Sequence, residues 1–278
     1  MSGIINFGFS PCPNDTFAFH ALVQGLVSVP GLEIRPHLAD VEELNQMALA
    51  GQLEMTKLSF HALGRVRRRY GLLSAGAALG RGCGPLLVAR PGTGLDKACR
   101  GPVAVPGRLT TAHLLLTLYL GRPPQVRPMI FSQVMEEVAR GRVPAGLVIH
   151  EGRFTYPELG LVELLDLGRW WEEQTGLPLP LGCIALRRDL GPELAHRLQA
   201  ALAQSVEYAW AHPRASADFI ARHAQEMDPE VTRSHIQLYV NQYTRELGEE
   251  GRRAVEEMMT RAQAAGLLPP DPTPLAWE

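Results

Sequence analysis

The stretch GFSPCPNDTF at residues 8–17 most constrains how this chain can fold. Residues 4–9 have the apolar character of a buried strand, and residues 16–27 have that of a helix. Two prolines between them set φ to about −65° and keep the chain out of helix until Asn14 and Asp15, which are natural N-cap residues. The sequence predicts a rigid strand–turn–helix whose helix N-terminus attracts anions beyond the end of the strand. An ordinary capped connection without function is the alternative interpretation.

Strand and helix patterns alternate along most of the remaining chain. Strands are predicted at 32–39, 53–58, 72–75, 85–89, 103–105, 145–149, 161–167 and 181–186. From Gly191 onward the pattern is helical only, at 192–210, 214–225, 229–246 and 249–265. Repeated strand–helix units predict an α/β fold with mixed, mainly parallel sheets.

The polar residues 90–100 interrupt this alternation and contain Pro91, Gly92 and Gly94, as expected of a crossing between two lobes. We therefore predict a large lobe made of residues 1–92 and 181–278, with a helical C-terminal tail packed on it. Residues 93–180 form the small lobe in this prediction. A cleft is expected between the two lobes.

Composition excludes some classes of partner. The chain has 278 residues, 20% of them charged, and a formal net charge of −2, so nothing favours nucleic acid or an acidic membrane as partner. No secretory or membrane-spanning pattern is visible, and a cytoplasmic protein is expected. The four cysteines have neither CxxC nor metal-type spacing, which predicts reduced, buried thiols and no metal site. Cys12 has no evident base beside it and is interpreted as a small buried residue.

Ligands of open α/β sheets bind beyond the carboxyl ends of the strands. Candidate residues at such ends, or on the helix that follows the second strand, are Ser10, Asn14, Asp15, Asn45, Lys57, Leu58, Ser59, Thr110, Thr111 and His150. Thr110 and Thr111 begin a helix, so their N–H and hydroxyl groups suit a carboxylate, with plain N-capping as the alternative. Lys57 alone is a weak candidate for pairing with an anionic substrate.

His150 is the strongest single candidate, because it follows the fully apolar strand predicted at 145–149. A histidine at the mouth of a buried strand is partly desolvated and titrates near neutral pH, which suits a general base or acid. The alternative is a histidine that only caps the strand by bonding a backbone carbonyl. The other histidines have no spacing typical of a metal site.

Five stretches, taken together and in order, resemble one enzyme family. They are GFSPCPNDTF at 8–17, TKLS at 56–59, VPGRLTT at 105–111, GLVIHEGRFTY at 146–156 and LPLPLG at 177–182. On these the chain resembles the 1,4-dihydroxy-6-naphthoate synthases, which act in the futalosine route of menaquinone biosynthesis. Gly152 and Leu109 depart from the family by occupying positions that are polar there.

The resemblance implies a fold like the type II periplasmic binding proteins, with the active site between two lobes. It implies a carbon–carbon lyase that converts cyclic dehypoxanthine futalosine to the naphthoate plus a small sugar-derived fragment, without a metal or organic cofactor. The family's histidine base falls on His150. Its substrate-contacting segments fall on Lys57, Leu58 and Ser59 and on Thr110 and Thr111, and Asn45 looks like a further contact.

Two other functions stay open at this stage. One is a solute-binding protein, because folds of this kind usually serve transport, although such a protein needs no base in its cleft. The other is the sister enzyme of the pathway, which makes an enolpyruvyl-benzoate from chorismate. The sequence leaves open whether Trp170 and Trp171 line the cleft or fill the core, and it does not determine the oligomeric state.

Overall fold

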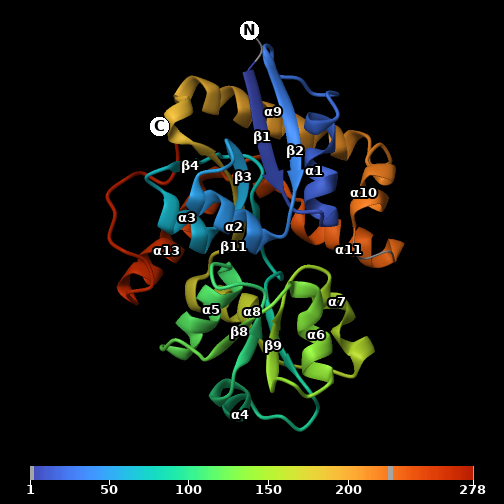
Figure 1. Ribbon diagram of the computed structural model, residues 1–278, viewed down its shortest axis with the longest axis vertical. Helices are drawn as coiled ribbons and strands as arrows, with labels where there is room; N and C mark the ends of the chain where they lie inside the picture. Colours follow the sequence, from blue (N-terminus) through green and yellow to red (C-terminus); the bar gives the residue numbers. More distant parts are fainter. Residues whose placement is uncertain (1–2, 225–227, 278) are drawn as a thin grey trace.

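The computed structural model describes residues 3–224 and 228–277, and it contains two α/β lobes that lie one above the other in Figure 1. Each lobe is built on its own sheet. Over the described residues, one sheet has six strands in the order β2-β1-β3-β11-β4, with β5 also paired to β11, and the other has five in the order β10-β6-β9-β7-β8. The α/β class and the two-lobed arrangement predicted from the sequence are confirmed.

The sheet of the large lobe collects strands from both ends of the chain. Its strands are β1 (Gly3–Phe9), β2 (Leu32–Leu38), β3 (Met55–Ser59), β4 (Tyr70–Leu72), β5 (Ala78–Gly80) and β11 (Leu179–Arg187). β1 pairs in parallel with β2 and β3, whereas β11 is antiparallel to β3, β4 and β5. β11 runs the other way because it brings the chain back from the small lobe.

The sheet of the small lobe is also mixed. Its strands are β6 (Leu86–Ala89), β7 (Val103–Val105), β8 (Val126–Pro128), β9 (Ala145–Val148) and β10 (Val162–Asp166). β7 is parallel to β8 and β9, whereas β6 is antiparallel to β9 and β10. Parallel pairs therefore do not predominate in either sheet, contrary to our expectation, because hydrophobic periodicity reports that a segment is a strand and not its direction.

The chain crosses between the lobes earlier than predicted. β5 still belongs to the first sheet and β6 already pairs in the second, so the crossing lies at residues 81–85 and not at 90–100. It packs closely on the small lobe: a Cβ on Gly168 would lie 1.8 Å from the carbonyl oxygen of Cys83. The return falls at β11, near residue 180 as expected. The polar segment at 90–100 instead forms a loop and the short helix α4 (Leu95–Arg100).

Helices cover both sheets. Those of the large lobe are α1 (Pro13–Val23), α2 (Val41–Ala50), α3 (Phe60–Val66), α9 (Pro192–Ala211), α10 (Ala217–His223), α11 (Pro229–Tyr239), α12 (Gln242–Arg245) and α13 (Gly248–Ala264), with a 3₁₀ turn at Arg188–Leu190. Besides α4, those of the small lobe are α5 (Thr111–Leu120), α6 (Phe131–Ala139), α7 (Gly152–Thr155) and α8 (Leu167–Thr175), with a 3₁₀ turn at Tyr156–Leu159. The C-terminal helices α9, α10 and α11 pack on α1, as predicted for the tail.

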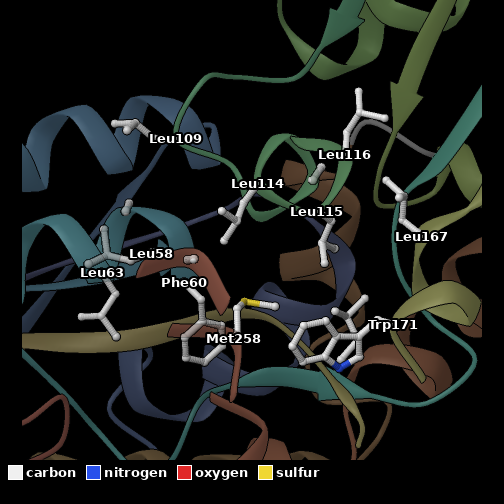
Figure 2. Packing of buried hydrophobic residues seen from close by; sticks show 14 of the residues in the cluster. Leu58, Phe60, Leu63, Leu109, Leu114, Leu115, Leu116, Leu167, Trp171 and Met258 are labelled. Atoms are coloured by element: carbon white, nitrogen blue, oxygen red, sulfur yellow. The ribbon is translucent and has the colours of Figure 1, made fainter. Parts of the chain in front are cut away.

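One apolar core joins the two lobes. Leu58 and Phe60 come from the large lobe, Leu115 and Trp171 come from α5 and α8 of the small lobe, and Met258 on α13 lies among them (Figure 2). Trp171 is fully buried and its indole N–H donates to the carbonyl of Pro178 at 3.1 Å. Trp171 is thus a core residue. No helix among the described residues is long and apolar enough to cross a membrane.

Candidate active site

A cavity lies between the lobes and takes its lining from both. Its polar lining residues are Ser10, Asn14, Asp15, Lys57, Ser59, Thr110, Thr111, His150 and Tyr239. Most of them follow the carboxyl end of a strand, which is the physical reason that positions far apart in the sequence meet here. The structure therefore brings together most of the residues that sequence reasoning selected.

The turn between β1 and α1 differs in detail from the prediction. Helix α1 begins at Pro13, with Cys12 as a cap residue whose side chain makes no capping hydrogen bond. Proline suits the first helical position because its fixed φ is already helical. The N–H group that proline lacks would have no partner within the helix at this position. Asn14 and Asp15 are therefore not the caps but lie in the first turn of the helix, and their side chains line the cavity.

Asp15 is held by four donors at the floor of the cavity. Its Oδ1 accepts from Lys57 Nζ at 2.6 Å and from Asn14 Nδ2 at 2.8 Å, and its Oδ2 accepts from the hydroxyl and backbone N–H of Ser10 at 2.8 and 3.2 Å. The Asp15 and Lys57 side chains are only 2% and 8% exposed. The charge of Lys57 is therefore balanced inside the protein, so Lys57 is not the free cation that an anionic substrate would need.

Two predicted contact residues lie behind the cavity wall. Asn45 on α2 holds Ser59 by accepting from its backbone N–H at 3.0 Å and donating to its hydroxyl at 3.1 Å. Leu58 is fully buried in the apolar core, because successive side chains of a strand point to opposite faces and its neighbours Lys57 and Ser59 face the cavity. The structure thus corrects the expectation of direct contacts for Leu58 and Asn45, and gives Asn45 a supporting position.

Thr110 and Thr111 begin α5 as predicted, but their hydroxyls already have partners. Thr110 caps the helix by accepting from the backbone N–H of His113 at 3.3 Å. Thr111 Oγ1 accepts from the backbone N–H of Phe60 at 3.1 Å and donates to the carbonyl of Leu181 at 2.7 Å. Thr111 therefore ties the small lobe to α3 and β11 of the large lobe at the edge of the cavity.

Replacing Thr111 by valine should lower the free energy of unfolding by about 1–3 kcal/mol, because it leaves the N–H of Phe60 and the carbonyl of Leu181 without this partner. Urea unfolding followed by circular dichroism measures the change. Thr117→Val is the matched control, since the Thr117 hydroxyl only bonds back to the carbonyl of His113 on its own helix. An equal loss in both variants would contradict the bridging role.

His150 stands just after β9 in a constrained conformation. Its φ is +55°, in the left-handed region that non-glycine residues rarely adopt. Its ring meets Phe131 of α6 edge to face, with centroids 5.0 Å apart, and lies against the ring of His235 on α11. Strained backbone held by close neighbours is typical of functional sites.

His150 is neutral at physiological pH. Burial lowers its pKa to about 4, and the positive charge of Lys57 acts in the same direction, while the negative charge of Asp15 opposes the shift. Its side chain is still partly accessible from the cavity, so a bound molecule can reach it. A neutral imidazole in a cavity is the form that accepts a proton.

The stability of the protein should fall as the pH is lowered from about 6.5 towards 4. Burial lowers the pKa of His61 and of His150 to about 4 and that of His235 well below 6.5, so in this interval the unfolded chain binds protons that the native protein does not. Melting temperatures at pH 7.5, 6 and 5 measure the effect. His61→Gln should lose less stability over this range than wild type; a melting temperature that does not fall on acidification would contradict the prediction.

Cys12, in the turn between β1 and α1, is not activated as a nucleophile. Burial raises the pKa of the Cys12 thiol well above its usual range, and the charge of Glu151 adds to this, so the reactive thiolate is disfavoured. Within residues 3–224 and 228–277, no three His, Cys, Asp or Glu side chains are grouped in a way that would hold a metal ion.

Sequence reasoning missed two residues of this region. Tyr239 lines the cavity and His235 lies directly behind His150, and both come from α11 in the C-terminal helical segment. Neither follows a strand, and the helical pattern of α11 shows only which face is apolar. Nothing in the sequence placed this helix against the turn that carries His150.

The two lobes and the cavity between them define a protein with the fold of the periplasmic binding proteins. An alkanesulfonate-binding protein from Xanthomonas axonopodis pv. citri superposes with a TM-score of 0.72 at 13% identity, covering 96% of this chain and 95% of the other. A Candida albicans protein described as having the generic periplasmic binding protein fold gives 0.70 at 11% identity, covering 96% and 92%. At these identities the likeness concerns the fold alone.

The chain belongs to the menaquinone biosynthesis family, whose model matches residues 5–264. It is 53% identical to the 1,4-dihydroxy-6-naphthoate synthase of Thermus thermophilus over 98% of both chains, and 46% identical to that of Streptomyces coelicolor over 95% of both. A crystal structure of a protein from Archaeoglobus fulgidus superposes with a TM-score of 0.87 at 36% identity, covering 95% of this chain and 98% of that one. The resemblance expected from the sequence is thus confirmed, and the protein is a biosynthetic enzyme.

Proposed function

We propose that this protein is a 1,4-dihydroxy-6-naphthoate synthase: a lyase that converts cyclic dehypoxanthine futalosine to 1,4-dihydroxy-6-naphthoate and a small sugar-derived fragment. The full-length identity to two synthases supports the reaction. The observation that carries the mechanism is His150, a neutral imidazole that faces the cavity between the lobes. A binding protein of this fold needs no base at that place.

In this proposal His150 removes an acidic proton from the bound cyclic substrate, and the ring then opens. Formation of the aromatic naphthoate supplies most of the driving force. The imidazolium formed is stabilised by the negative charge of Asp15, which already acts against the lowering of the His150 pKa. Hydrogen-bond donors aimed at the developing enolate oxygen lower the barrier further.

The proposed donors lie on both sides of the cavity. Ser59 is held by Asn45 on the large lobe, and the first turn of α5 presents backbone N–H groups at Thr111 and Ala112. A helix N-terminus attracts carboxylates, so we propose that the carboxylate of the aromatic part of the substrate lies against α5. We propose α5 and not Lys57 as the site of the substrate carboxylate, because Asp15 already balances the charge of Lys57.

The proposal is tested by incubating the purified protein with the cyclic substrate and measuring the naphthoate by chromatography and mass spectrometry. Formation of the naphthoate without added metal or cofactor supports it. Binding without turnover would instead indicate a solute-binding protein, and conversion of chorismate would indicate the sister enzyme. The cytoplasmic setting expected from the sequence stays a prediction.

A further inference from the structure

A second histidine, His235 of α11, lies against His150 although the reaction described above does not use it. The two rings are nearly parallel, with an interplanar angle of 23° and centroids 6.2 Å apart. His235 is fully buried, and Phe131 meets His150 from α6. The His150 ring therefore has aromatic neighbours from both lobes, one on α11 and the other on α6.

Hydrogen bonds fix the tautomer of His235. The amide nitrogen of Asn14 donates to Asp15, so the amide oxygen is free to accept. His235 Nε2 lies 2.9 Å from that oxygen and therefore carries the proton. Burial lowers the pKa of His235 well below its usual range, so the ring is neutral and its Nδ1 is unprotonated.

Burial is the main cause of this neutral state, and the charged groups around the ring act in both directions. A proton on His150 would disfavour a second proton on His235, and the positive charge of Lys57 acts in the same direction. Glu151 acts in the opposite direction, because its Oε2 lies 4.0 Å from His235 Nδ1 and a carboxylate there favours a protonated ring. Asp15 is fixed by hydrogen bonds from Lys57, Ser10 and Asn14 at the floor of the cavity. These bonds also fix Asn14, and Asn14 in turn holds His235.

We propose that His235 is a positioning residue that holds the His150 ring in its productive orientation, through the stacked rings and the hydrogen bond to Asn14. This inference rests on the proposed function, because it assumes that His150 is the base. The backbone of His150 at φ +55° needs such support, since this conformation is unfavourable by itself. A base displaced by about 1 Å can lose about 10²-fold in rate.

Two variants of His235 separate the ring from the hydrogen bond. His235→Phe keeps an aromatic face beside His150, whereas His235→Gln keeps a donor for Asn14 but removes the ring. We expect kcat to fall about 10–100-fold in His235→Gln and less in His235→Phe, with KM changed less than threefold in both. His20→Gln is the matched control, because His20 is also buried, lies on α1 with Asn14 and packs on Phe219 away from the cavity.

An NMR measurement gives an answer that does not depend on turnover. In the wild-type protein, ¹⁵N spectra of the imidazoles should show His235 protonated at Nε2 only, with ring contacts to His150. In His235→Gln the pKa of His150 should rise from about 4 towards 6.5, because water reaches a ring that is no longer covered.

Wild-type kcat in His235→Gln, or an Nδ1-protonated His235 without contacts to His150, would overturn the inference. A failure of the proposed function would give a different result from a failure of the inference about His235. If His150→Gln keeps full turnover, the assignment of the base is wrong, while the contact between the two rings remains measurable by NMR.

Discussion

Replacing His150 by glutamine should lower kcat by about 10²–10⁴-fold, which is what a positioned general base typically contributes. The side chain lies in the cavity as a neutral imidazole, whereas the amine of Lys57, which also lines the cavity, is paired with Asp15. Steady-state production of the naphthoate measures the loss. His150→Asn is a useful second variant, because asparagine tolerates the positive φ of +55° better than glutamine does.

The control for this prediction is His37→Gln, because His37 is exposed on β2 and does not line the cavity. It should retain wild-type rates. The pH profile gives an independent readout: since burial lowers the pKa of His150 to about 4, kcat/KM should fall on the acid side with an apparent pKa near that value. Full turnover by folded His150→Gln and His150→Asn would refute the role of His150.

Replacing Asp15 by asparagine should destabilise the fold by about 3–5 kcal/mol, because it leaves the charge of Lys57 buried without its partner. The side-chain amide of the new asparagine cannot accept from all four donors of Asp15 in either of its two orientations. Both carboxylate oxygens accept from two donors each, so the new NH₂ group faces either Lys57 and Asn14 or the two donors of Ser10. Chemical denaturation measures the free energy of unfolding.

The double variant Asp15→Asn with Lys57→Met should recover much of this loss, since both charges are then removed. Glu33→Gln is the surface control: Glu33 pairs with Arg35, and both side chains are more than half exposed, so this variant should unfold at nearly the wild-type denaturant concentration. A free energy of unfolding for Asp15→Asn within 1 kcal/mol of wild type would show that the ion pair is not structurally important.

Much of the fold is readable from local pattern. Helix α2 illustrates this: Asp40 accepts a hydrogen bond from the backbone N–H of Glu42 at its start, and Gly51 ends it with a φ of +73°. The same local rules identified most strands to within a few residues. They misplaced the crossing between the lobes, because whether Leu86–Ala89 pairs with β4 or with β9 depends on partners distant in the sequence.

Some residues of the candidate site could be predicted from the sequence, and others could not. Ser10, Ser59, Thr110, Thr111 and His150 were identified because each lies just beyond a strand or at a helix start, where polar side chains face a cleft. Leu58 was included with its neighbours, yet strand alternation turns it into the core. Asn45 lies one layer behind Ser59, a distinction that spacing alone does not reveal.

The sequence by itself determined the alternation of strands and helices, the family and the histidine at the end of the strand, because these depend on local residue order. Only the tertiary structure decided the electrostatics of the site. The pairing of Asp15 with Lys57 and the stack of His235 on His150 join segments that are remote in the chain, and their burial depends on how the lobes pack. Burial then encloses the ion pair of Lys57 with Asp15 and keeps the imidazole of His150 neutral.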